Sequence, residues 1–255
     1  MRTWHVLTLG LLSAVPPRAP VTRYQMDVQE TLTMDDGEDI LTDTLFVSAI
    51  IRLTESDSTT GRVAAFVVES ASFRHTNGQG GSPAMEEDPA SVGLTARFHL
   101  VPGRPAAVVS VRLGADVAAM PLTPNGNPPG RASGYISSSF MYLFPQLRPS
   151  LQPGDHWADT TRMNGGSTVS AWDVLNEDAG VYQVRRLETS TADAAVETGR
   201  VVSSSSTTSE MRTTVRGPVV STTIAQHGKI TITDSEEPHL LITSRSRIAR
   251  IVRLN

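Results

Sequence analysis

The sequence predicts a mainly β protein: a strongly curved antiparallel sheet, in the form of a half-barrel or sandwich, with one short amphipathic helix. Three observations predict this fold. Most of the chain alternates apolar and polar residues with the two-residue period of strands. The turns between these segments are too short for the crossover that parallel strands need. Ten or more short strands beside a single helix favour a sheet that curls or closes.

The first alternating segments predict an antiparallel meander. We expect strands at 21–33, 42–54 and 62–73, joined by a turn at Asp35-Asp36-Gly37 and another at 56–61. Both connections are short, so successive strands pair with each other in opposite directions.

Apolar residues occupy both faces of the second and third strands. In 42–54 one face carries leucine, valine, alanine and isoleucine, yet the opposite face still contains Phe46 and Ile50. Phe66 similarly lies opposite Val67 in the third strand. A sheet covered on one side alternates more cleanly than this. Two apolar faces therefore indicate either two packed layers or a concave side that lines a cavity, and both readings stay open.

The rest of the chain continues as strands and loops within a single domain, 21–255. Residues 75–93 and 114–134, rich in glycine and proline, are predicted loops. The order of strands and turns after residue 153 repeats that of the first strands, which suggests two similar halves, 21–134 and 135–255. The further predicted strands are 94–101, 106–113, 156–163, 167–175, 181–189, 198–216, 219–226, 229–234 and 240–254.

Residues 135–147 (YISSSFMYLFPQL) have the one clear helical period. Apolar side chains fall at i, i+4, i+7 and i+8, and Pro145 ends the helix. The stripe consists of Ile136, Phe140, Leu143 and Phe144. The helix either plugs the open side of the curved sheet and completes the core, or covers an apolar cavity, or meets lipid or a membrane partner.

The first twenty residues follow the order of a secretory signal peptide. Arg2 gives a positive start, residues 6–15 are an apolar run too short to span a bilayer, and Pro16 and Pro17 follow. The alternative is an uncleaved, buried N-terminal segment. We therefore expect residues 1–20 to be a signal peptide and the mature protein to be exported to the periplasm of the bacterial envelope.

The last predicted strand carries arginines and has no acidic residue after Glu237. Arg245, Arg247 and Arg253 share one face of this strand, and Arg250 lies on the other. Such a stripe can contact anionic lipid headgroups or an acidic partner. Arginines on a strand also commonly pair with acids on neighbouring strands.

Composition and motifs exclude several function classes. The chain has 22 basic and 26 acidic residues and no cysteine, which argues against nucleic-acid binding, thiolate metal sites and cysteine nucleophiles. The six histidines share no i, i+2 or i, i+4 spacing, so there is no local zinc motif. Nucleotide-binding and serine-hydrolase motifs are also absent. We therefore expect no metal, no cofactor and no enzymatic activity.

One segment carries a family resemblance. Phe144-Pro145-Gln146-Leu147, followed by Gly154-Asp155-His156-Trp157, resembles the joint between halves in an uncharacterised family of exported bacterial β-rich proteins. The overall plan resembles, more weakly, the LolA-like half-barrel carriers. That second resemblance implies a curved sheet whose hollow side binds acyl chains.

Two functional hypotheses follow from these patterns. The first is a non-enzymatic periplasmic binding protein that shelters an apolar ligand, a lipid or acyl chain, between the sheet and the helix. Its candidate ligand contacts are Phe46, Ile50, Phe66, Phe140, Leu143 and Phe144. The alternative is a structural or accessory subunit that docks on a membrane-bound envelope complex. Its candidate contacts are the loops 75–93 and 114–134 together with Arg245, Arg247, Arg250 and Arg253.

Overall fold

The computed structural model describes residues 21–59, 61–77, 84–100, 107–112, 132–145, 147–163, 165–196, 199–215, 217–234 and 240–254. The predicted signal peptide, 1–20, and most of the predicted loop 114–134 lie outside these residues. Among the helices of the described part, none is both long and apolar enough to cross a membrane.

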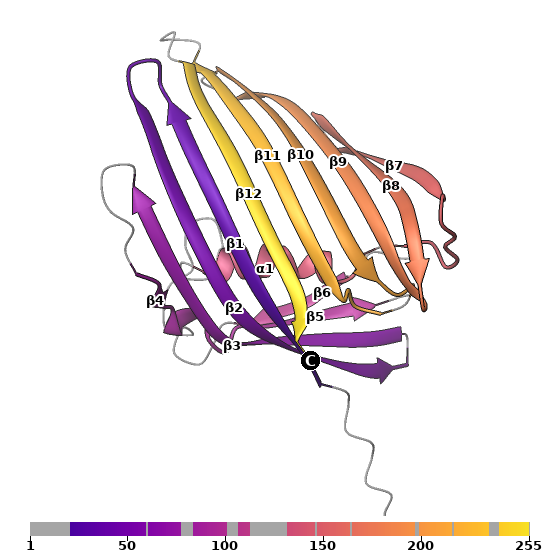
Figure 1. The fold of residues 1–255 in the computed structure, drawn as a ribbon. Helices are drawn as coiled ribbons and strands as arrows, with labels where there is room; N and C mark the ends of the chain where they lie inside the picture. The colour runs from indigo at the N-terminus through magenta and orange to yellow at the C-terminus, as the bar shows by residue number, and fades with distance from the viewer. Residues whose placement is uncertain are drawn as a thin grey trace, which may run out of the picture.

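The protein is one large, open antiparallel sheet of twelve strands, which confirms the predicted fold class (Figure 1). The order across the sheet is β6-β5-β3-β2-β1-β12-β11-β10-β9-β8-β7, with the short β4 paired to β3. The strands are β1 (Val21–Asp35), β2 (Ile40–Ser58), β3 (Gly61–Asn77), β4 (Glu86–Glu87), β5 (Thr95–Leu100), β6 (Ala107–Arg112), β7 (His156–Met163), β8 (Gly166–Asp178), β9 (Val181–Val196), β10 (Gly199–Thr213), β11 (Ser221–Asp234) and β12 (Leu240–Leu254).

The first and last strands, β1 and β12, lie side by side in the middle of this sheet. The chain runs outward from β1 to the edge strand β6, begins again at the opposite edge with β7, and returns strand by strand to β12. β12 then pairs with β1, so that Arg23 lies opposite Leu254. Every pairing along this path is antiparallel, as the short turns predict.

A bulge in β3 accompanies the bend of the sheet. Ile50 of β2 pairs with Ser70 and Ile51 pairs with Val68, so Glu69 is an extra residue in β3. A bulge of this kind bends the strand and increases its twist. The lower part of β3, with β5 and β6, consequently runs across the lower end of the long strands (Figure 1).

One predicted strand boundary is wrong. The strands expected at 219–226 and 229–234 are a single strand, β11, which continues through Gly228. Gly228 pairs with Ser205 of β10 and Arg245 of β12, so its backbone remains in the ladder on both sides. A lone glycine weakens a strand but does not break one whose two neighbours hold it in place.

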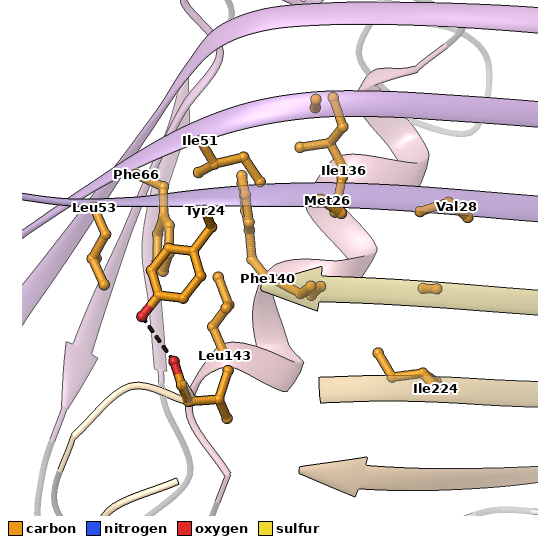
Figure 2. Close-up of a cluster of buried hydrophobic side chains, with 14 of the residues drawn as sticks. Tyr24, Met26, Val28, Ile51, Leu53, Phe66, Ile136, Phe140, Leu143 and Ile224 are labelled. Atoms are coloured by element: carbon orange, nitrogen blue, oxygen red, sulfur yellow. Dashed lines mark hydrogen bonds between the residues drawn. The ribbon is translucent and has the colours of Figure 1, made fainter. Parts of the chain in front are cut away.

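The helix covers the lower half of one face, which we call the inner face (Figure 1). α1 (Ser133–Phe140) begins two residues before the predicted start and continues as the 3-10 helix η2 (Met141–Leu143). The predicted apolar stripe points into the core: Ile136, Phe140 and Leu143 are fully buried against Phe66 and Tyr24 (Figure 2). The helix is therefore the plug that completes the core.

Hydrogen bonds at both ends hold the helical segment in place. The buried Asp88 carboxylate accepts hydrogen bonds from Ser91 Oγ (2.8 Å) and from the backbone N–H of Ala132 (2.9 Å), just before α1. The Tyr24 hydroxyl donates to the carbonyl of Val219 (2.9 Å; Figure 2), and the Val219 N–H donates to the carbonyl of Leu143. Burial raises the pKa of Tyr24, which keeps this hydroxyl a donor.

Candidate functional site

The residues predicted to contact a ligand separate into two groups on opposite faces of the sheet. Phe66 of β3 lies together with Phe140 of α1 and Leu143 of η2 between the sheet and the helix, and all three are 0–1% exposed. The rings of Phe66 and Phe140 stack with centroids 4.7 Å apart, and Phe144 packs edge-on against Phe66 at 5.7 Å. The space between sheet and helix is thus filled by the protein's own side chains.

Phe46 and Ile50 lie on the outer face instead. They alternate with the buried Val47, Ala49 and Ile51 of β2, so their side chains point away from the helix. The guanidinium of Arg74 covers the Phe46 ring at 4.1 Å from its centroid. Phe46 and Ile50 therefore cannot share a site with the helix residues.

Strand register divides the inner face into three bands. In the lower band, apolar residues such as Val28, Ala249 and Ile224 stand side by side and pack in the core. The middle band is polar, and we call it the polar belt. It consists of two rows across the sheet, His75–Leu45–Glu30–Arg247–Gln226–Thr207–Glu188–Ser170 and Asp43–Leu32–Arg245–Gly228–Ser205–Ser190–Thr168.

The upper band is apolar again and lies beyond the helix. We call it the apolar rim: Met34, Leu41, Val201, Ile230, Ile232 and Leu241. Leu41, Ile230 and Ile232 are between 38% and 59% exposed, and the other three are half-buried. The opposite side of the same strands is largely serine, threonine and charged residues, as in Thr42, Lys229 and Thr231. The outer face of these strands also exposes two apolar side chains, Ile40 (69%) and Val202 (40%), so the inner face is distinguished by the pocket that adjoins its apolar residues.

A pocket of about 450 Å³ lies between the helix and the rim. Leu32 and Leu45 form its apolar part, and Glu30, Asp43, His75 and Tyr135 supply polar groups. Tyr135 comes from the first turn of α1, and the other residues come from β1, β2 and β3. A mostly apolar cavity with a few converging polar groups is typical of small-molecule sites.

Glu30 lines this pocket, and Arg245 lies beside the pocket, bonded to Glu30. Arg245 donates to the Glu30 carboxylate at 2.5 Å, and the Tyr135 hydroxyl also hydrogen-bonds to Glu30. Burial, together with the Glu30 charge, raises the pKa of Tyr135, so the hydroxyl stays protonated. Glu30 is thus a buried carboxylate with two partners.

Arg247 lies beneath the helix rather than on the surface. Its guanidinium donates to Ser138 Oγ (2.9 Å), Ser139 Oγ (2.6 Å) and the Tyr135 carbonyl (3.0 Å). Burial lowers the pKa of Arg247 from its ordinary value, and the charge of Glu30 acts in the opposite direction. Arg247 consequently fixes the helix on the polar belt.

Two of the four arginines predicted to bind a partner are engaged within the protein. Arg245 pairs with the acid Glu30 of a neighbouring strand, the alternative considered for this stripe, whereas Arg247 donates to α1 instead of to an acid. Arg253 also occupies an inner-face position of its strand, beside Tyr24. Arg250 alone is on the outer face, opposite Asp27 and Thr223 in the sheet, and is exposed.

The outer part of the pocket carries a second acid–base pair. His75 Nε2 lies 3.6 Å from Asp43 Oδ1, and both side chains are almost half exposed. No group of three or more histidine, aspartate or glutamate side chains is arranged to hold a metal ion anywhere in the described ranges. His75 and Asp43 supply an imidazole and a carboxylate at the solvent side of the pocket.

Comparison of the sequence with known proteins finds no match, whereas comparison of the structure finds a similar fold. Neither a protein-family model nor a curated protein matches the sequence. The fold is similar to part of lipovitellin, in a structure that concerns lipid–protein interactions, with a TM-score of 0.53 and 11% identity. The similarity covers 92% of this chain, which spans 25% of that lipovitellin chain. The two proteins therefore share a large β-sheet fold.

A second solved structure is much less similar. DynF, from the dynemicin biosynthesis pathway of Micromonospora chersina, has a TM-score of 0.25 and 7% identity over 93% of this chain and 82% of that chain. A similarity this low does not indicate a shared fold.

Proposed function

We propose that this protein is a non-enzymatic binding protein that holds the hydrocarbon chain of a lipid on the apolar rim and in the adjoining pocket. The observation that supports it is the apolar rim itself. Side chains such as Leu41 and Ile230 lie exposed and in register on the inner face, beyond the reach of the helix. Exposed apolar surface gathered beside a pocket is characteristic of a binding site.

This proposal moves the ligand away from the helix. The core under α1 has no room for a chain, because Phe66, Phe140 and Leu143 already fill it. The site instead uses Leu32 and Leu45 in the pocket and continues along the rim. The shared fold with part of lipovitellin, a protein studied for its lipid interactions, supports the same ligand class.

The alternative role, docking on a membrane-bound envelope complex, has less support. Two of its four arginines are committed to internal contacts, Arg245 with Glu30 and Arg247 with α1. The loop residues 78–83 and 113–131 that would share in docking lie outside the described residues. The docking hypothesis stays a prediction from sequence.

We further propose that the protein acts in the bacterial periplasm. The support is the order of charge, apolar run and prolines in residues 1–20.

One expression experiment tests both the location and the ligand. The full chain is expressed in a Gram-negative host, the periplasmic fraction is purified, and the product is analysed by intact mass and by organic extraction. We expect a periplasmic protein that lacks about twenty N-terminal residues and carries lipid near one molecule per chain. A full-length cytoplasmic product contradicts export, and a periplasmic product without lipid contradicts the binding role.

A further inference from the structure

The charged groups at the pocket differ in how much they show to a ligand. Of the inner pair, Glu30 is 10% exposed and Arg245 is 43% exposed, so the pair presents mainly the arginine's positive end. Of the outer pair, Asp43 is 48% exposed. A molecule in the pocket thus meets the Asp43 carboxylate in the lining, and the Arg245 guanidinium lies next to the pocket, bonded to the lining residue Glu30.

These two charges flank a single apolar residue. Leu32 of β1 pairs directly with Asp43 of β2 and with Arg245 of β12, and all three lie on the inner face. Neighbouring strands are about 4.8 Å apart, so the Cα atoms of Asp43 and Arg245 are separated by about 10 Å. Long side chains can close on a small polar group across this distance, above Leu32.

Each charge retains capacity for a ligand. Arg245 uses one nitrogen, Nη2, to bond Glu30, and a guanidinium has five N–H donors in all. Asp43 lies 3.6 Å from His75, which is a separation longer than a hydrogen bond. An anionic group can therefore join Arg245 while a cationic group joins Asp43.

A ligand with one charge fits this arrangement poorly. An anionic headgroup attracted by Arg245 lies near the carboxylates of Asp43 and Glu30, and a cationic headgroup beside Asp43 lies near Arg245. Like charges brought together disfavour the wrong ligand. A headgroup with both signs satisfies both sides.

We propose that the pocket selects a zwitterionic amphiphile, with its anionic group at Arg245, its ammonium group at Asp43 and its hydrocarbon chain along the apolar rim. This inference rests on the proposed function, because it takes the rim as the site of the chain. It adds the chemical class and the orientation of the ligand.

Titration calorimetry with four amphiphiles that share one 14-carbon chain tests this selection. The probes are lysophosphatidylethanolamine (zwitterionic), lysophosphatidylglycerol (anionic), monomyristoylglycerol (uncharged) and tetradecylamine (cationic), each below its critical micelle concentration. We expect the zwitterionic probe to bind about tenfold more tightly than the uncharged one, as a pair of charge-assisted contacts allows. The singly charged probes should bind less tightly than the zwitterion.

Substitutions assign the two ends of the headgroup. D43N and R245Q should each remove most of the zwitterion's advantage, measured as the ratio of the affinities for lysophosphatidylethanolamine and monomyristoylglycerol in the same variant. R250Q is the matched control, because Arg250 is on the same strand as Arg245 but on the outer face. Thermal unfolding confirms that each variant is folded before it is titrated.

The outcomes separate the two proposals. Equal binding of all four probes, or no loss of the advantage in D43N and R245Q, overturns the headgroup assignment and leaves the rim as a chain-binding site. No binding of any probe overturns both proposals. Retention on phosphatidylethanolamine vesicles without binding of monomeric probes also overturns the headgroup assignment, because the headgroup then belongs to a membrane surface.

Discussion

Replacing Phe140 by alanine should lower the free energy of unfolding by about 4 kcal/mol, since truncating a fully buried phenylalanine leaves a cavity as well as removing apolar contacts. Phe140 is 1% exposed, stacks on Phe66 and meets Phe98 edge-on with centroids 6.3 Å apart. It is the main contact between α1 and the sheet. Urea denaturation followed by tryptophan fluorescence measures the change, with Trp157 and Trp172 as buried reporters.

Phe46 provides the matched control on the outer face. It is half-buried, and its ring contacts the guanidinium of Arg74 instead of the core. F46A should cost about 1 kcal/mol, the typical value for a partly exposed position. If F140A lost no more unfolding free energy than F46A, the helix would not be the plug that completes the core.

Removing Arg247 should have the second largest effect. R247A takes away the donor for three acceptors in α1 and leaves Glu30 with one positive neighbour fewer, so we expect a loss of about 3 kcal/mol. The helix should also loosen from the polar belt, which faster hydrogen exchange of the α1 amides would report.

Arg250 is the control for this change, three residues along the same strand. It lies exposed on the outer face, so R250A should change the free energy of unfolding by less than about 0.5 kcal/mol. A similar small effect in R247A would mean that the three contacts of its guanidinium do not anchor the helix.

Most strands and the helix could be predicted because their signals are local. The two-residue period of 21–33 and 42–54 and the stripe Ile136–Phe140–Leu143 are visible within short windows, and both the open curved sheet and the single helix are present. Which face of each strand is buried was harder to predict from the sequence. In β2 both alternating sets are apolar, and only the distant helix decides that Ile51 is buried while Ile50 faces outward.

The apolar rim could not be predicted from sequence for a different reason. Leu41 follows Ile40 in a short segment between acids and a threonine, and Ile230 and Ile232 alternate with threonines. They become neighbours only through the β1–β12 and β11–β12 registers, which join the two ends of the chain. Register over such sequence distances depends on every pairing between the first and last strands. The same register places Arg245 opposite Leu32, one inward position along the strand from the partner of Glu30, so that its guanidinium reaches the Glu30 carboxylate diagonally.

A single titration tests the central claim that the rim binds hydrocarbon. The probe is a pyrene-labelled dodecanol, which has no charge, and the variants are I230D and I248D. Ile230 (41% exposed) is on the inner face and Ile248 (51% exposed) is on the outer face of the adjoining strand, so the two changes are equal in chemistry and differ in side. We predict about tenfold weaker binding in I230D, because a carboxylate in an apolar site is unfavourable, and unchanged binding in I248D. Equal affinities for I230D, I248D and the unchanged protein would contradict the account.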